Sequence, residues 1–278
     1  MSLAQAIVLA VVQGLTEFLP VSSSGHLVLA SWLFDWPDQG LVYDAAVHLA
    51  TLAAVLIYFR RTWITLVRGF VTGGRVVLIE DGGEENGMPA RKLVWMLVLA
   101  SIHVAVLGLV LKDALETTFR KPEEVGISLL VTAGLLVVAE LVGKRSKRLA
   151  SITIKETMFA GLFQAIAVIP GVSRAGSTMA GGMVGGLTRD AAARLSFLLA
   201  VPAIGGSGLF LMLEVISSEG LSERPWGMII LGAVIAFITG YLAIAWFMRV
   251  LRTVSFRPFI AYVAIVGVAV LVARAFGA

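Results

Sequence analysis

The chain consists of long apolar stretches that alternate with short polar loops. A helix needs about 20 mostly apolar residues to cross the hydrocarbon core of a bilayer. The stretches that meet this requirement lie at 42–59, 93–111, 125–143, 195–216, 226–248 and 258–276. The pattern therefore predicts an all-α integral membrane protein with six transmembrane helices.

Two further apolar stretches are interrupted by polar residues and predict a different structure. Residues 3–34 contain Pro20 followed by the polar run 22–26, and residues 157–188 contain Pro170 followed by a second polar run. Irregular backbone at membrane depth persists only where protein or a water-filled cavity covers it. The two stretches therefore predict re-entrant helical hairpins, with two ordinary kinked spans as the alternative.

The distribution of charge in the loops predicts how the chain is oriented. Clusters of Lys and Arg occupy the loops at 60–92, 144–155 and 249–257, whereas acidic residues dominate the loops at 112–124 and 214–225. Because short basic loops stay in the cytoplasm, we expect the first three loops inside and the other two outside. The count of crossings then requires the second interrupted stretch to return to the cytoplasmic side. The loop charges do not show whether the first interrupted stretch crosses the membrane. We treat it as re-entrant by analogy with the second.

The two interrupted stretches also resemble each other in sequence. Residues 13–26 (QGLTEFLPVSSSGH) align with residues 164–177 (QAIAVIPGVSRAGS) at a constant offset. Each half of the chain would then hold one hairpin and three spans, so the second half would start from the opposite side of the membrane. The sequence thus predicts a single membrane domain, 1–278, built of two inverted-topology repeats at about 1–145 and 152–278.

Composition narrows the possible classes of protein. Hydrophobic residues make up 58% of the chain and charged residues 14%, whereas about 25% of the residues of a soluble domain are charged. The formal net charge is +4, but the basic residues lie in short loops between apolar stretches and indicate topology. We therefore expect no nucleic acid as a partner. The absence of cysteine excludes disulfide and thiolate chemistry.

The strongest candidates for chemistry are the ionisable residues of the interrupted stretches, Glu17, His26 and Arg174. A charge at membrane depth costs at least about 2.5 to 3.5 kcal/mol, so such residues are functional candidates by default. The hydroxyls and glycines around them are Ser22, Ser23, Ser24, Gly25, Gly171, Ser173, Gly176, Ser177 and Thr178. A guanidinium binds phosphate in bidentate fashion, glycines let amides approach an anion, and a serine beside a carboxylate and an imidazole can be activated.

This set predicts a phosphate site. The alternative is that the serines only satisfy the freed backbone groups of kinked helices. His48 lies close to the first motif in the chain and is a further candidate for the site, whereas we expect His103 and Glu140 to be structural.

The strings that carry these residues resemble a known family. EFLPVSSSGH at 17–26 and PGVSRAGST at 170–178 closely resemble the two signature motifs of the bacterial undecaprenyl-diphosphate phosphatases, the bacitracin-resistance family, and SFLLAVP at 196–202 is also similar. The resemblance extends over essentially the whole chain. It implies removal of the terminal phosphate from undecaprenyl diphosphate, which returns the carrier lipid to cell-wall synthesis. It also implies six spans with two inverted hairpins, a divalent cation (Mg²⁺ or Ca²⁺), and a site open to the outer face of the bacterial cytoplasmic (inner) membrane.

The motifs of this family assign roles to individual residues. Glu17, Ser23 and His26 match the first motif, and Ser173, Arg174 and Thr178 match the second. Gln13 stands where many members have a glutamate, an alternative that the motif also allows. Because an amide cannot act as a base, Glu17 would carry the anionic role, including that of metal ligand. The remaining substrate-binding candidates are Gln13, Ser22, Gly171 and Gly176.

A mechanism follows from this set as a hypothesis. Arg174 and the hairpin amides would hold the diphosphate, and a divalent ion near Glu17 would neutralise charge. Ser23 would attack the terminal phosphorus, with His26 as general base and later acid. In the rival assignment His26 is the nucleophile and Ser23 a phosphate ligand, and the sequence does not decide between them.

Other functions and partners follow from the same pattern. A secondary transporter or flippase for a phosphorylated polyprenyl lipid is the alternative function, because broken helices and inverted repeats are equally typical of transporters. The expected partners are a polyprenyl diphosphate substrate and membrane lipids. The sequence leaves open whether the protein forms a homodimer.

Overall fold

A computed structural model describes residues 1–76, 78, 87–111, 121–217, 225–251 and 253–277. Its long apolar helices are α3 (Leu41–Tyr58), α5 (Ala90–Val110), α7 (Pro122–Val142), α10 (Arg189–Ser217), α11 (Trp226–Val250) and α12 (Arg257–Ala275). Six helices of the described residues are long and apolar enough to cross a membrane. They coincide with the six predicted stretches, so the chain is an all-helical, multi-pass membrane protein.

The outer faces of these helices are apolar. Large side chains such as Trp95, Leu141 and Ile265 are more than half exposed. A soluble protein rarely exposes apolar surface of this extent. Lipid tails therefore cover these faces.

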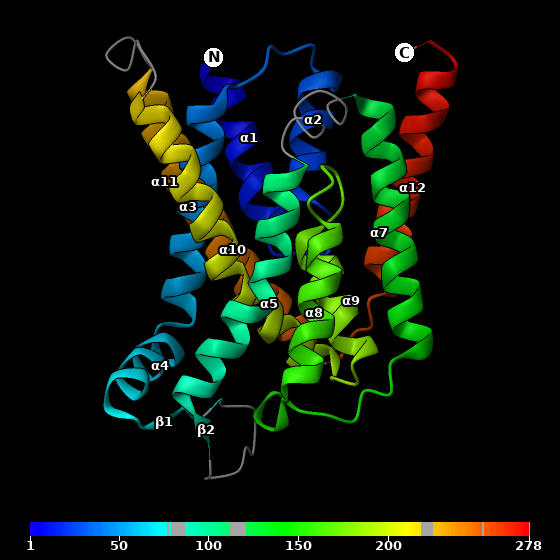
Figure 1. Ribbon diagram of the computed structural model, residues 1–278. Coiled ribbons are helices and arrows are strands. Elements are labelled where there is room, and N and C mark those ends of the chain that lie inside the picture. Colours follow the sequence, from blue (N-terminus) through cyan, green and yellow to red (C-terminus); the bar gives the residue numbers. More distant parts are fainter. Residues whose placement is uncertain (77, 79–86, 112–120, 218–224, 252, 278) are drawn as a thin grey trace.

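Two pairs of shorter helices occupy the interrupted stretches. They are α1 (Leu3–Thr16) with α2 (Ser23–Leu33), and α8 (Ile154–Ile166) with α9 (Arg174–Val184). In Figure 1, α1 descends from the upper edge and α2 returns to it, whereas α8 rises from the lower edge and α9 returns toward it. Both stretches are thus interrupted at their polar motifs, as predicted.

In each pair a serine side chain caps the start of the second helix. Ser22 caps α2 by accepting a hydrogen bond from Gly25 N at 3.3 Å, and Ser173 caps α9 by accepting one from Gly176 N at 3.0 Å. Such caps satisfy amides that the first turn of a helix leaves without partners. Ser22 adopts a φ of 73°, which is uncommon for a residue other than glycine. The two caps stand at aligned positions of the two motifs.

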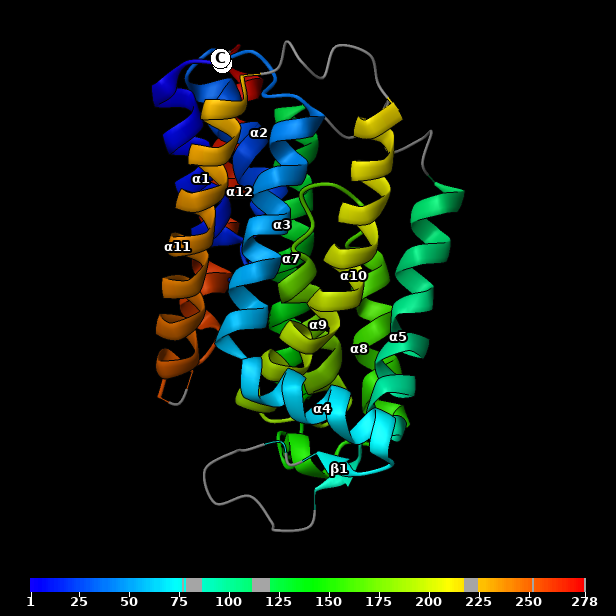
Figure 2. The ribbon, with the colours of Figure 1, turned by 90° about the vertical axis from the view of Figure 1, so that its left-hand side faces the viewer.

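The first helix of each pair packs against a span from the other half of the chain. Helix α1 lies on α11, and α8 lies on α5; Figure 2 shows these two groups on opposite sides of the molecule. Glycines permit both approaches. A Cβ added to Gly14 would lie 1.9 Å from Thr239 Oγ1, and one added to Gly161 would lie 2.4 Å from Ala100 O. Small residues serve the same purpose in other helix interfaces within membranes.

Short elements gather at the lower edge in Figure 1. Helix α4 (Arg60–Thr72) follows α3, strand β1 (Arg75–Val76) pairs antiparallel with β2 (Met88–Pro89), and a 3-10 turn covers Leu149–Ser151. The basic residues of 60–92 predicted a loop, and this prediction was wrong for α4, which is helical. The described parts of the three basic clusters all lie at this edge. The loops expected outside, 112–124 and 214–225, lie largely beyond the described residues.

Candidate active site

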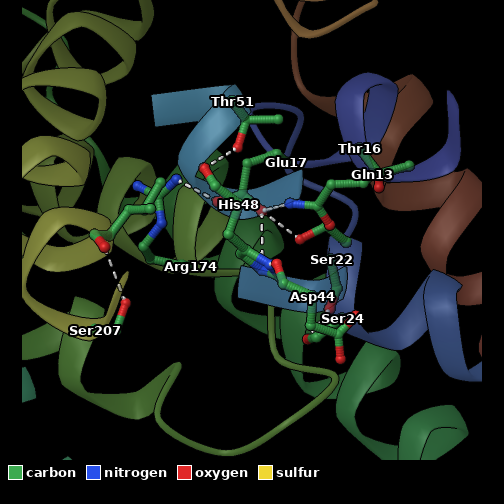
Figure 3. A network of polar contacts seen from close by, with 12 residues as sticks. Gln13, Thr16, Glu17, Ser22, Ser24, Asp44, His48, Thr51, Arg174 and Ser207 are labelled. Atoms are coloured by element: carbon green, nitrogen blue, oxygen red, sulfur yellow. Dashed lines mark hydrogen bonds and ion pairs between the residues drawn. The ribbon is translucent and has the colours of Figure 1, made fainter. Parts of the chain in front are cut away.

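A buried carboxylate, Glu17, stands at the centre of the polar contacts in Figure 3. It follows the last residue of α1 and is 7% exposed. Its Oε2 atom accepts a hydrogen bond from Ser23 Oγ at 2.5 Å and another from Gln13 Nε2 at 3.0 Å. The carboxylate and the serine hydroxyl of the first motif are therefore in direct contact.

Arg174 connects the two motifs. It is the first residue of α9, and its Nη2 lies 3.0 Å from Glu17 Oε1. The side chains of this ion pair are only 16% and 6% exposed. The structure thus brings residues that are far apart in the sequence into one polar cluster, which lies at the tips of both helix pairs.

His48 also faces this cluster, from α3. Its Nδ1 lies 2.8 Å from the carbonyl oxygen of Asp44 and must donate, because a carbonyl only accepts. Its Nε2 lies 3.8 Å from Glu17 Oε2, which is too long for a direct hydrogen bond. The sequence suggested His48 only through its nearness in the chain.

His26 has other partners than those the mechanistic hypothesis supposed. Its Nδ1 lies 2.7 Å from the carbonyl oxygen of Ser22, and its Nε2 lies 2.8 Å from the hydroxyl of Tyr262 on α12. The two rings stack with centroids 5.6 Å apart. Because Nδ1 must donate to the carbonyl, Nε2 of the neutral ring accepts from Tyr262. The hydroxyl of Ser23 instead donates to Glu17. Nothing in the sequence pointed to Tyr262, because it lies in an ordinary apolar span.

The remaining predicted residues support the two turns. Besides capping α9, Ser173 donates its amide to Thr132 Oγ1 at 3.0 Å, and Thr178 Oγ1 donates to the carbonyl of Arg174 at 2.6 Å. The amide of Gly171 lies 3.3 Å from Ser24 Oγ and donates to it, which joins the two turns directly. In the present arrangement these groups hold the backbone that carries the ionisable side chains.

Gly171 allows its turn to pack closely on α7, and Gly176 allows close packing of the two turns. Gly171 has a φ of 86°, and a Cβ added there would lie 2.8 Å from Ser128 Cβ. A Cβ added to Gly176 would lie 3.3 Å from Pro20 Cβ in the other turn. A larger residue at Gly171 would therefore be strained both by its backbone conformation and by contact.

The cluster can accommodate an anion and has limited capacity for a metal. Helices α2 and α9 both begin beside it, and the start of a helix favours negative charge. Within the described residues, no group of three His, Cys, Asp or Glu side chains could hold a metal ion. Gln13 Oε1 is buried without a hydrogen-bond partner beside Glu17. One carboxylate and one amide oxygen suit a hard cation that takes its other ligands from water and substrate phosphates.

Comparisons with known proteins place this cluster in context. The family model of the bacitracin resistance protein BacA matches residues 6–269. An undecaprenyl-diphosphatase of Alcanivorax borkumensis is 42% identical over 267 residues, which cover 96% of this chain and 97% of that protein. The undecaprenyl-diphosphatase of Desulforudis audaxviator is 44% identical over 268 residues, with 96% of each chain covered. That of Myxococcus xanthus is 41% identical over 273 residues, which cover 98% of this chain and 89% of the relative.

Proposed function

Because the chain belongs to the bacitracin resistance protein BacA family, we propose that it hydrolyses undecaprenyl diphosphate to undecaprenyl phosphate and inorganic phosphate. Its activity is that of an integral membrane phosphatase that recycles the carrier lipid of cell-wall synthesis. Relatives named undecaprenyl-diphosphatase match nearly the whole chain. The observation that carries the chemistry is the 2.5 Å contact between Ser23 Oγ and Glu17 Oε2.

In the proposed reaction, Ser23 is the nucleophile. Its oxygen bonds to the terminal phosphorus as the bond from phosphorus to the bridging oxygen breaks, and the lipid phosphate leaves. Glu17 accepts the hydroxyl proton, because its Oε2 already receives that hydrogen bond. Arg174 holds the phosphate oxygens. Water then attacks the phosphoserine, inorganic phosphate leaves, and Glu17 returns the proton to Ser23.

This scheme moves the first proton transfer from His26 to Glu17. We assign His26 to the second half of the reaction, as the general base that takes a proton from the attacking water and passes it to the departing inorganic phosphate. The rival in which His26 is the nucleophile remains to be tested. Either role requires its Nε2 to leave the hydroxyl of Tyr262, which it contacts at 2.8 Å.

A divalent cation, Mg²⁺ or Ca²⁺, belongs to the proposal. When bound, it would neutralise negative charge on the phosphates. Glu17 and Gln13 Oε1 are the oxygens that would hold it, together with the substrate. The buried Gln13 Oε1, which has no hydrogen-bond partner, supports this assignment.

We also propose that the two helix pairs are re-entrant hairpins of an inverted-topology repeat. Three observations support this: the pairs approach from opposite edges (Figure 1), the caps at Ser22 and Ser173 stand at aligned positions, and α1 and α8 each pack on a span of the other half. The charge pattern supports a cytoplasmic lower edge, and the family resemblance supports a site open to the outer face of the inner membrane. A homodimer stays a prediction, which cross-linking in native membranes would test.

Release of phosphate by the detergent-purified protein tests the function. The unaltered protein should release inorganic phosphate from a polyprenyl diphosphate. Ser23→Ala should lower turnover by at least about 1,000-fold, because the nucleophile is lost, while substrate binding stays nearly unchanged. Ser31→Ala, on the same helix, is the matched control and should retain activity. A transporter would release no phosphate, and substantial turnover by Ser23→Ala would exclude the serine mechanism.

A further inference from the structure

An open cleft lies on the lipid-facing side of the turn between α1 and α2, and it has a volume of about 460 Å³. It is lined by the end of α1 and the turn, and by the end of α11 and the start of α12. The lining residues are Leu15, Thr16, Leu19, Val21, Trp246, Val250, Val254, Pro258, Phe259 and Tyr262. Ligand sites of about 300 to 1,000 Å³ hold small organic molecules.

The lining of the cleft is almost wholly apolar. Among its lining residues only Thr16 and Tyr262 carry a side-chain hydroxyl. Thr16 Oγ1 donates to the carbonyl of Val12 at 2.6 Å, and the Tyr262 hydroxyl contacts His26 Nε2 at 2.8 Å. Because both hydroxyls already have partners inside the protein and the rest of the lining is almost wholly apolar, the cleft favours an apolar occupant.

The cleft and the candidate active site share one segment of chain. Leu15, Thr16 and Leu19 line the cleft, whereas Glu17, between them, points to Ser23 and Arg174. A second connection runs through Tyr262, which lines the cleft and also holds His26. A molecule in the cleft therefore lies against the opposite side of the turn that carries the catalytic carboxylate.

We propose that this cleft binds the isoprenoid chain of the substrate, next to its diphosphate. This inference rests on the proposed function and extends it, because it identifies where the lipid part of the substrate lies. Leu15, Trp246 and Tyr262 of the lining are each at least 45% exposed, so a molecule that stays anchored in the surrounding lipid can reach the cleft from the side. The start of the chain packs against the turn and Tyr262, and the rest of the chain continues into the membrane.

Substrates of different chain length test the proposal. Dimethylallyl diphosphate has one isoprene unit and farnesyl diphosphate has three. Leu15→Trp fills the cleft from α1, where Leu15 is 45% exposed. We expect it to raise KM for farnesyl diphosphate by about tenfold or more with little change in kcat, because binding common to ground and transition states is lost. KM for dimethylallyl diphosphate should change less than about twofold, since so short a chain hardly enters the cleft.

Ile7→Trp is the matched control, because Ile7 is 37% exposed on the same helix, outside the cleft. It should leave KM for both substrates unchanged. An equal rise for both substrates in Leu15→Trp would overturn the proposal and indicate a disturbed turn. An unchanged KM for farnesyl diphosphate would also overturn it and leave an ordinary membrane lipid as the occupant.

A photoreactive polyprenyl phosphate separates this inference from the proposed function. The purified protein should be labelled within 15–21 or 246–262 whether or not it releases phosphate. Labelling confined to other segments would refute the cleft as the chain site. The absence of phosphate release from every diphosphate, together with labelling at the cleft, would defeat the phosphatase function and leave lipid binding intact.

Discussion

Arg174 and Ser23 each contact one oxygen of Glu17, and these two contacts determine how readily the carboxylate can accept a proton. In the present state Arg174 pairs with Glu17 Oε1 while Ser23 donates to Oε2. A carboxylate beside a guanidinium is a weak base, because the pair stabilises its charged form. A phosphate that draws Arg174 toward itself would weaken that pair. The basicity of Glu17 would then rise at the moment when Ser23 must lose its proton.

Arg174→Lys tests the role of the guanidinium. We expect a loss of at least about 100-fold in kcat/KM, because a compact ammonium cannot make the planar bidentate contact with phosphate. Protein levels in membranes should stay close to those of the parent. Arg249→Lys, at the end of α11, is the matched control and should retain activity. If Arg174→Lys stays within a few-fold of the parent, Arg174 serves only its ion pair with Glu17.

His26→Ala tests the assignment of the second base. A general base contributes about 100-fold to 10,000-fold, so the variant should keep a residual rate that rises with pH as hydroxide replaces the missing base. His103→Ala in α5 is the control and should behave as the parent. Mass spectrometry of rapidly quenched reactions should find the phosphoryl group on Ser23. A phosphoryl group on His26 would reverse the roles of the two residues.

The sequence predicted part of this site, and physical reasons explain the part that it did not predict. Glu17 and Arg174 were recognisable because charge is costly at membrane depth. The contact of His26 with Tyr262 could not be foreseen, because it depends on the rotation of α12 about its axis. A lone tyrosine in an apolar span gives no signal of its own.

At the scale of whole elements, apolar length and proline positions were sufficient to predict the spans and the breaks. Helix α4 was missed because its sequence, with Arg60, Arg61 and Arg68 among apolar residues, resembles a basic loop. A short amphipathic helix at an interface has neither the length nor the uniform hydropathy of a span. The close approach of α8 to α5 likewise could not be predicted from the sequence. A glycine in an apolar helix can serve packing, a bend or a turn, and the sequence does not distinguish these roles.

Gly161→Ala tests the packing of α8 on α5. The added Cβ would lie 2.4 Å from the backbone oxygen of Ala100, so the helices must move apart. Overpacking of this kind costs about 1 to 3 kcal/mol, and the midpoint of thermal unfolding in detergent should fall. Gly134→Ala on α7 is the control, because an added Cβ there meets nothing within 4 Å. A Gly161→Ala variant as stable as the parent would mean that α8 is not held tightly against α5.

At the scale of the whole molecule, the loop charges and the helix directions both predict an inverted repeat, and they are independent observations. Helix α4, residues 144–148, the end of α11 and the start of α12 all carry basic residues, and these segments lie at one edge of the helices (Figures 1 and 2). The charge rule assigns this edge to the cytoplasm. Helix α1 starts at the opposite edge and α8 starts at the basic edge, which an inverted repeat requires. The orientation of the entire site therefore depends on one measurable fact, namely which side of the membrane the basic edge faces.

Labelling of single cysteines measures that fact against a clean background, because the chain has no cysteine of its own. Lys121 precedes α7 at the upper edge and Arg148 lies at the basic edge, and both are exposed. In intact cells an impermeant thiol reagent should label Lys121→Cys, whereas Arg148→Cys should react only after the membrane is made permeable. Reversed labelling would mean that the protein has the opposite orientation, with the start of α1 on the cytoplasmic side. Labelling of both variants in intact cells would contradict the single crossing by α7 that separates these two positions.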